Sequence, residues 1–137
     1  MNEDLRRAVC ILTEGNYTCV LYRADAYLTD SQRGIRPLLE LLESGRDLNG
    51  FCAADKVVGM AAAFLYRLMG IKAVWASVIS SPAVRILTEG GIAVYWDAEV
   101  PAILNRSHTG LCPMETAVRN SETPREALLS IKETLAD

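Results

Sequence analysis

The spacing of hydrophobic residues along the chain switches repeatedly between a helical and a strand-like period. Leu5, Ala8, Val9 and Leu12 recur at i, i+3, i+4 and i+7, which predicts a helix that stops before Gly15. Similar patterns, with proline near the start or glycine just past the end, predict five further helices. The six helices are expected over residues 3–14, 35–44 and 54–69, from Ser81 to just before Gly90, from Pro113, and from the capping-box sequence Thr123-Pro124-Arg125-Glu126.

Short runs of β-branched and aromatic residues lie between these helices. Residues 17–22 and 26–29 predict an antiparallel hairpin, and residues 73–79 and 92–96 predict two strands joined by a helix. Such a crossover makes the two strands parallel and the connection right-handed. The pattern therefore predicts an α/β fold with a mixed sheet, in which ligands bind at the edge where the parallel strands end.

Length and composition narrow the class of protein. A chain of 137 residues predicts a single domain over residues 1–137, and a hydrophobic content of 50% is typical of a packed globular protein. The formal net charge is −3 and the 14 Lys and Arg residues are scattered, so nucleic acid is not expected as a partner. The longest apolar run, residues 57–66, is far shorter than the roughly 20 residues of a membrane span.

The cysteines and the N-terminal segment favour a cytoplasmic protein. The first residues lack the basic start, apolar stretch and small-residue cleavage site of a signal peptide. The four cysteines stand far apart, without a CxxC pair, which favours reduced thiols. His108 is the sole histidine, so a zinc site with two histidines is excluded.

Two adjacent charges, Asp55 and Lys56, open the apolar stretch predicted as the helix 54–69. A helix N-terminus has unpaired N–H groups and the positive end of the helix dipole, which suits Asp55 and disfavours Lys56. One interpretation is that Asp55 caps the helix and Lys56 extends its ammonium into solvent. The other, which Lys56 favours, is that both are catalytic residues of a site for an anionic ligand.

Cys112 precedes Pro113 and Glu115 at the expected start of a helix. The helix dipole at such a position lowers a thiol pKa and favours the nucleophilic thiolate. A small, half-buried cysteine beneath a loop is the commoner case, and the charge of Glu115 would oppose thiolate formation. Cys112 is therefore a candidate nucleophile and Glu115 a candidate ligand-binding residue.

Two further segments have the chemistry of an anion site. Ser80 and Ser81 follow a buried strand at a helix start, and Arg33 and Arg36 flank a glycine before another helix, as in a clamp for a carboxylate or phosphate. N-capping by Ser81 and ordinary exposed arginines explain the same segments without a ligand. The residues predicted to converge on one cleft at the carboxyl edge of the parallel strands are Asp55, Lys56, Ser80, Ser81 and Cys112.

Four segments stand out by their order and spacing, and together they cover most of the chain. They are RGIRPLLELLE at 33–43, ADKVVGMAAAFLY at 54–66, SVISSPA at 77–83 and LCPMETAV at 111–118. They resemble an uncharacterised family, domain of unknown function 1893, of the cytidine deaminase-like superfamily. The resemblance implies a three-layer α-β-α fold whose mixed central sheet is led by a β-hairpin and contains a parallel βαβ unit, with a pocket at the start of the helix that begins near Asp55.

The zinc ligands of that superfamily are missing from the sequence. Zinc deaminases carry His-x-Glu at that helix start and Pro-Cys-x-x-Cys where the next strand enters its helix. The corresponding places read Ala54-Asp55-Lys56 and Ser80-Ser81-Pro82, and the segment Cys112-Pro113-Met114-Glu115 lies one strand and a long loop later without a second cysteine. We therefore expect no metal and no other cofactor, and hydrolytic deamination does not carry over with the fold.

Three functions are compatible with these residues. We place first the binding of a small nucleoside- or nucleotide-like metabolite in a metal-free pocket. A metal-independent enzyme would use Cys112 or Lys56 as nucleophile or general base, and the sequence leaves open whether the protein is an enzyme. An assembly protein would form a homo-oligomer through exposed aromatic residues such as Trp75 or Trp96.

Overall fold

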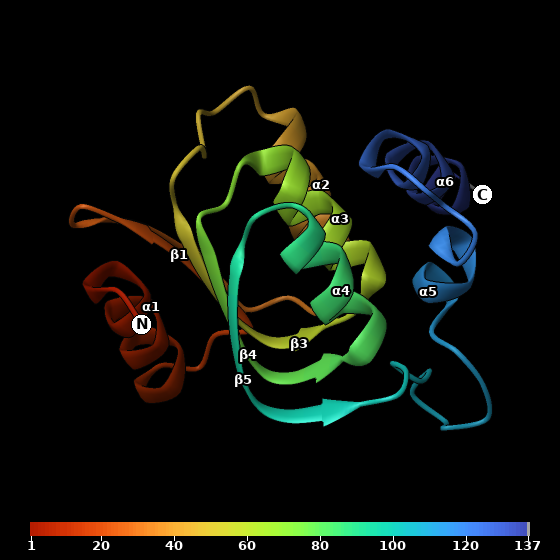
Figure 1. Ribbon diagram of the computed structural model, residues 1–137, viewed down its shortest axis with the longest axis horizontal. Coiled ribbons are helices and arrows are strands. Elements are labelled where there is room, and N and C mark those ends of the chain that lie inside the picture. The colour runs from red at the N-terminus through yellow and green to blue at the C-terminus, as the bar shows by residue number, and fades with distance from the viewer. Residues whose placement is uncertain (137) are drawn as a thin grey trace.

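A mixed five-stranded sheet forms the middle of the molecule (Figure 1). The computed structural model describes residues 1–136. The strands are β1 (Cys19–Arg23), β2 (Ala26–Asp30), β3 (Cys52–Val58), β4 (Ala73–Ser80) and β5 (Ala93–Val100). The helices are α1 (Glu3–Glu14), α2 (Arg36–Glu43), α3 (Met60–Met69), α4 (Ser81–Glu89), α5 (Pro113–Val118) and α6 (Pro124–Ala136). In the order β2-β1-β3-β4-β5, β1 is antiparallel to both neighbours, whereas β3, β4 and β5 are parallel.

Helices cover both faces of the sheet, which confirms the predicted three-layer architecture. α1 lies alone on one face, where Leu5, Ala8 and Leu12 pack against β1, β3 and β4. α2, α3 and α4 lie on the other face, and α5 and α6 pack outside α3 (Figure 1). Because neighbours enclose α3 on all sides, seven of its ten residues are buried.

None of the helices within residues 1–136 combines the length and the apolar character needed to cross a bilayer. α3, the most hydrophobic of them, has ten residues.

The prediction of one helix over residues 54–69 is wrong. Residues Cys52–Val58 form the strand β3 at the centre of the sheet, and α3 begins only at Met60, after the N-cap residue Gly59. A strand that is covered by helices on both faces has the same continuous apolar run as a buried helix, so periodicity cannot separate the two. Asp55 and Lys56 therefore lie on a strand, and neither caps α3.

Two helix starts, those of α4 and α6, differ in detail from their predicted caps. Ser80, not Ser81, caps α4, because its hydroxyl accepts a hydrogen bond from the amide of Ala83 at 3.2 Å. At α6 the Thr123 hydroxyl accepts from the amide of Glu126 as predicted, but the Glu126 carboxylate accepts from the amide of Glu122 instead of Thr123. Cys112 occupies the N-cap position of α5, where its side chain makes no capping hydrogen bond.

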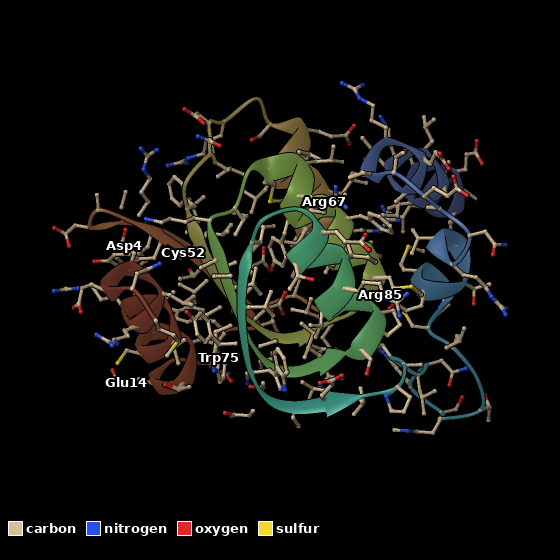
Figure 2. The ribbon with its side chains drawn as sticks, viewed as in Figure 1. Asp4, Glu14, Cys52, Arg67, Trp75 and Arg85 are labelled. Atoms are coloured by element: carbon tan, nitrogen blue, oxygen red, sulfur yellow. The ribbon has the colours of Figure 1, made fainter. Side chains whose placement is uncertain are left out.

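Trp75 is not available for assembly, contrary to the sequence prediction. Its side chain lies beneath α1, on the face of β4 opposite α3, and is 8% exposed (Figure 2). Trp96 on the edge strand β5 is 37% exposed, and its neighbour Tyr95 is 38% exposed. α1 contacts β1, β3 and β4, which leaves the corresponding face of β5 open.

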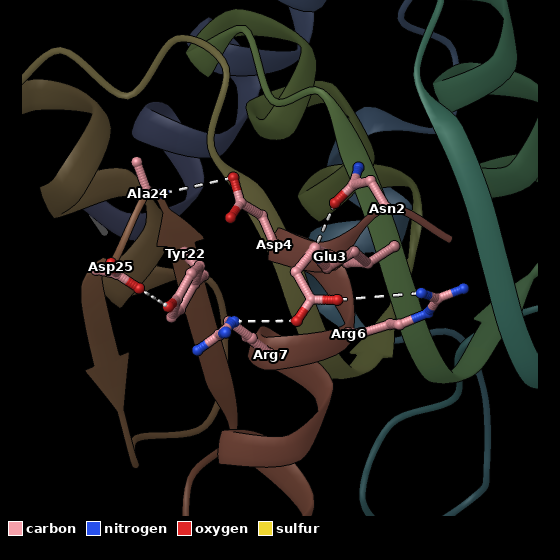
Figure 3. Close-up of polar contacts among 9 residues, drawn as sticks. Asn2, Glu3, Asp4, Arg6, Arg7, Tyr22, Ala24 and Asp25 are labelled. Atoms are coloured by element: carbon pink, nitrogen blue, oxygen red, sulfur yellow. Dashed lines mark hydrogen bonds and ion pairs between the residues drawn. The ribbon is translucent and has the colours of Figure 1, made fainter.

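The hairpin β1-β2 closes with a two-residue turn at Ala24-Asp25. Both residues have positive φ, +47° and +70°, as the tight turns that suit the twist of a hairpin require. Asp25 tolerates this region, and its carboxylate accepts a hydrogen bond from the hydroxyl of Tyr22 at 2.8 Å (Figure 3). The methyl group of Ala24 crowds the backbone in the left-handed region, and the long hydrogen bond that its amide donates to Asp4 Oδ2, at 3.4 Å, does not relieve this crowding.

Replacing Ala24 by glycine is therefore expected to raise the free energy of unfolding by about 0.5–1 kcal/mol, since glycine adopts positive φ without strain. Urea unfolding of the purified variant measures the change. Ala26→Gly, two residues later on the exposed strand β2, is the matched control and is expected to lower stability by a similar amount. Equal losses in both variants would contradict strain at Ala24.

Candidate functional site

A cavity of about 870 Å³ lies between the hairpin, the start of α2, the junction of β3 with α3, and the segment 103–115. It lies at the carboxyl end of β3, the edge at which ligands bind in parallel sheets. Most of its wall is apolar, and this part includes Leu21, Leu28, Leu38, Leu41, Ile103 and Met114. The cavity has the size and character of a small-molecule site.

Asp55 and Cys19, at the floor of the cavity, share a hydrogen-bonded group with Tyr66, which is not itself a lining residue. The strand register sets Cys19, the first residue of β1, directly opposite Asp55 on β3. Tyr66 of α3 reaches both of them, because its hydroxyl donates to Asp55 Oδ2 at 2.6 Å and lies 3.3 Å from Cys19 Sγ. Tyr66 is fully buried, and Cys19 and Asp55 are 9% and 8% exposed.

Burial sets the protonation of all three groups. It raises the pKa of Asp55 to about 6, against the opposing hydrogen bonds from the Tyr66 hydroxyl and the Val57 amide. Burial and the charge of Asp55 raise the pKa of Cys19 and of Tyr66 well above their usual values. At neutral pH the thiol and the phenol therefore stay protonated, and Cys19 is not an activated nucleophile.

Glu115 links α5 to the N-terminus of α3. Its carboxylate accepts hydrogen bonds from the amides of Met60 at 2.6 Å and Ala61 at 3.0 Å, so it caps a helix that lacks a capping side chain of its own. Gly59 makes this contact possible, because a Cβ at that position would overlap the carboxyl group of Glu115. Burial raises the pKa of Glu115 although the two amides oppose this effect.

Five of the eight candidate residues from the sequence line the cavity: Asp55, Lys56, Arg33, Cys112 and Glu115. The other three lie elsewhere. Ser80 is buried beneath α4, the Ser81 hydroxyl donates to Glu99, and Arg36 donates to the carbonyl of Leu135 at 3.3 Å. The cavity opens on the β1 side of β3, away from the β4–α4 turn, so the predicted cleft does not include the two serines.

Lys56 lines the cavity, but it does not lie at a helix N-terminus. Lys56 was predicted to conflict with a helix dipole, but α3 begins four residues later. Its side chain is exposed at the cavity rim, and its amide donates to the carbonyl of Thr18 at 3.0 Å. Cys112 is half-buried in the wall, at the N-cap position of the six-residue helix α5.

Sequence reasoning missed Cys19, Tyr66 and Gly59. One signal was present for Tyr66: it carries the sole polar side-chain group in the apolar segment 60–66. A buried phenol needs a hydrogen-bond partner, and the preceding strand offers a carboxylate. The role of Gly59 depends on a contact with α5 that no local pattern predicts.

The residues at the positions implied by the deaminase resemblance do not form a zinc site. α3 starts with Gly59, Met60 and Ala61, and α4 starts with Ser80 and Ser81, so neither start offers an imidazole or a thiolate. The described part of the chain contains no group of three or more His, Cys, Asp or Glu side chains arranged to hold a metal. A carboxylate from α5, that of Glu115, occupies the N-terminus of α3.

A search of the curated proteins found no match to this chain. A crystal structure of a DUF1893 family protein (TM1506) from Thermotoga maritima is similar, with a TM-score of 0.87 and 26% identity over 97% of this chain and 91% of that chain. The apo form of dCMP deaminase from the cyanophage S-TIM5 has a TM-score of 0.46 and 13% identity, over 70% of this chain and 99% of that chain. The family model TM1506, described as a domain of unknown function (DUF1893), matches residues 7–135, so the chain belongs to this family.

Proposed function

We propose that the protein binds a small metabolite, of nucleoside or nucleotide size, in the cavity at the carboxyl end of β3. The observation that carries this proposal is the cavity itself, whose volume of about 870 Å³ falls within the range of ligand sites in proteins. Its wall is largely apolar and meets a small number of polar groups at the floor and at the rim. Such a combination binds the body of a ligand by burial and orients it by hydrogen bonds.

The rim of the cavity supports a ligand with an anionic group. Lys56, Arg33 and Arg106 line it, and none of them belongs to the ion pairs formed within residues 1–136. Asp30 also lines the rim, where its single negative charge offsets only one of the three cations. An excess of unpaired cations at the mouth of an apolar cavity attracts carboxylates, sulfonates and phosphates.

A cytoplasmic location belongs to the same proposal. All four cysteines are free thiols, and Cys19 and Cys52 are buried away from any partner cysteine. Free thiols persist in a reducing compartment, where nucleotides and related metabolites are also found.

The proposal is tested with anilinonaphthalene sulfonate, a dye with an apolar body and one anionic group. Val57 lines the cavity but is 48% exposed, so Val57→Trp fills the space without disturbing the core. We expect calorimetric titration to show that the wild type binds the dye and that Val57→Trp weakens binding by at least about tenfold. Tyr95→Trp, which adds an indole on a strand that does not line the cavity, is expected to bind like the wild type.

Lys56→Met tests the rim in the same titration. The substitution keeps the alkyl stem and removes the charge, so it should weaken dye binding by about threefold to tenfold at low salt and have little effect at high salt. Dye binding that survives Val57→Trp unchanged would contradict a ligand site in this cavity. Native mass spectrometry of the protein purified from cells then gives the mass of any ligand that remains bound.

A further inference from the structure

Asp55 is a charged side chain at the apolar floor of the cavity, and its carboxylate is only partly used. It accepts one short hydrogen bond, from the Tyr66 hydroxyl at 2.6 Å, and one long one, from the Val57 amide at 3.3 Å. A carboxylate offers about four acceptor positions. The small exposed part of Asp55 belongs to the cavity wall, so acceptor capacity remains on the side where a ligand would lie.

The charge of Asp55 has no cationic partner within the described residues. The ion pairs there join Glu3 to Arg6 and Arg7, and Glu43 to Lys132. A buried carboxylate without a countercharge is costly, because hydrogen bonds alone replace only part of its hydration. The pKa of Asp55, raised by burial to about 6, reflects this cost. A cationic ligand group beside Asp55 would remove most of it.

The groups around Asp55 can neither bind an anionic ligand group nor supply a positive charge to Asp55. The Tyr66 hydroxyl already donates its hydrogen bond to Asp55, and Cys19 remains a neutral thiol. Leu21, Leu38 and Ala62 complete the nearby wall and offer no polar atoms. The floor therefore accepts hydrogen bonds, whereas Lys56 and Arg33 at the rim donate them.

We propose that Asp55 binds a positively charged nitrogen group, an ammonium or an amidinium, at the buried end of the ligand. This proposal rests on the proposed function and adds the polarity of the ligand, with the cation at the floor and the anionic group at the rim. Tyr66 holds the carboxylate in place through its hydrogen bond, and the cation occupies the acceptor positions that face the cavity.

Three naphthalene probes of similar size test this assignment in competition with anilinonaphthalene sulfonate. Naphthylmethylamine is cationic, naphthylmethanol is neutral and naphthoate is anionic. We expect the wild type to bind the amine about tenfold more tightly than the alcohol, whereas naphthoate, whose carboxylate suits the cationic rim, gains nothing from Asp55. Asp55→Asn keeps the shape of the side chain and is expected to abolish the preference for the amine, while the affinity for the alcohol changes by less than about twofold.

Asp30→Asn is the matched control, because Asp30 also lines the cavity. On β2 it lies opposite Cys19 in the strand register, as Asp55 does on β3. We expect this variant to keep the preference for the amine. A wild type that binds the amine no better than the alcohol, or a preference that survives Asp55→Asn, overturns the assignment. With either result, the proposed function still holds if Val57→Trp weakens binding of the dye. Dye binding that is unchanged in Val57→Trp contradicts the cavity site itself.

Discussion

Replacing Glu115 by alanine will lower the free energy of unfolding by about 2–4 kcal/mol, because the change leaves two buried amides without an acceptor. The amides of Met60 and Ala61 donate to this carboxylate at 2.6 and 3.0 Å, and Glu115 is 3% exposed. Urea unfolding monitored by circular dichroism measures the loss.

Two further variants separate the capping contact from general damage. Glu133→Ala removes an exposed glutamate from α6 and is expected to change stability by less than about 0.5 kcal/mol. Gly59→Ala places a methyl group where the Glu115 carboxyl lies and is expected to cost about 1–3 kcal/mol. The double variant Gly59→Ala, Glu115→Ala should then lose less than the sum of the two, since the clash disappears with the carboxylate. Strictly additive losses would contradict a direct contact.

The stability of the protein will fall as the pH rises through about 6, and Asp55 will account for about 3 kcal/mol of the change. Burial raises the pKa of Asp55 from 3.8 in the unfolded chain to about 6 in the folded protein, so the folded state binds this proton more tightly. The stabilisation is complete below the unfolded value, is lost between the two values, and stays lost above about 6. Burial raises the pKa of Glu115 as well, which adds a change of the same sign.

Asp55→Asn isolates the contribution of this residue, because the amide keeps the acceptor for Tyr66 and has no proton to lose. We expect the variant to be more stable than the wild type at about pH 8, by roughly 1–3 kcal/mol, and to show a flatter dependence of stability on pH. Asp97→Asn on the exposed face of β5 is the control and should keep the wild-type slope. An unchanged slope in Asp55→Asn would show that Asp55 is not the buried acid.

Local sequence patterns predicted the helices and every strand except β3, although they joined β3 to α3. The helix 3–14 agrees with α1 at both ends, because its apolar stripe, Asn2 cap and following Gly15 are all local. The helix 35–44 agrees with α2 within one residue. The strand β3 was missed because it lacks alternation and its apolar run continues into α3 after the single residue Gly59, whereas the equally buried β4 was recognised by its β-branched and aromatic residues.

The candidate site was predictable only where chain position determines it. Asp55 and Lys56 were predicted at a helix start and instead lie near the end of β3, which still brings them to this edge, whereas Cys112 and Glu115 lie at a helix start as predicted. The group at the floor depends instead on the register between β1 and β3 and on the face that α3 turns toward the sheet. Neither is encoded in a single segment, because both follow from packing between segments.

The cap supplied by Glu115 also governs how the cavity can open. Fifty-five residues separate Glu115 from Met60, and the same stretch of chain, residues 103–115, forms one wall of the cavity. Moving this wall outward breaks both hydrogen bonds and uncovers the N-terminus of α3, so opening on this side is a local unfolding reaction. A ligand that entered on this side would bind only the molecules in which α5 has detached, whereas entry past Lys56 and Arg33 at the rim leaves the cap on α3 intact.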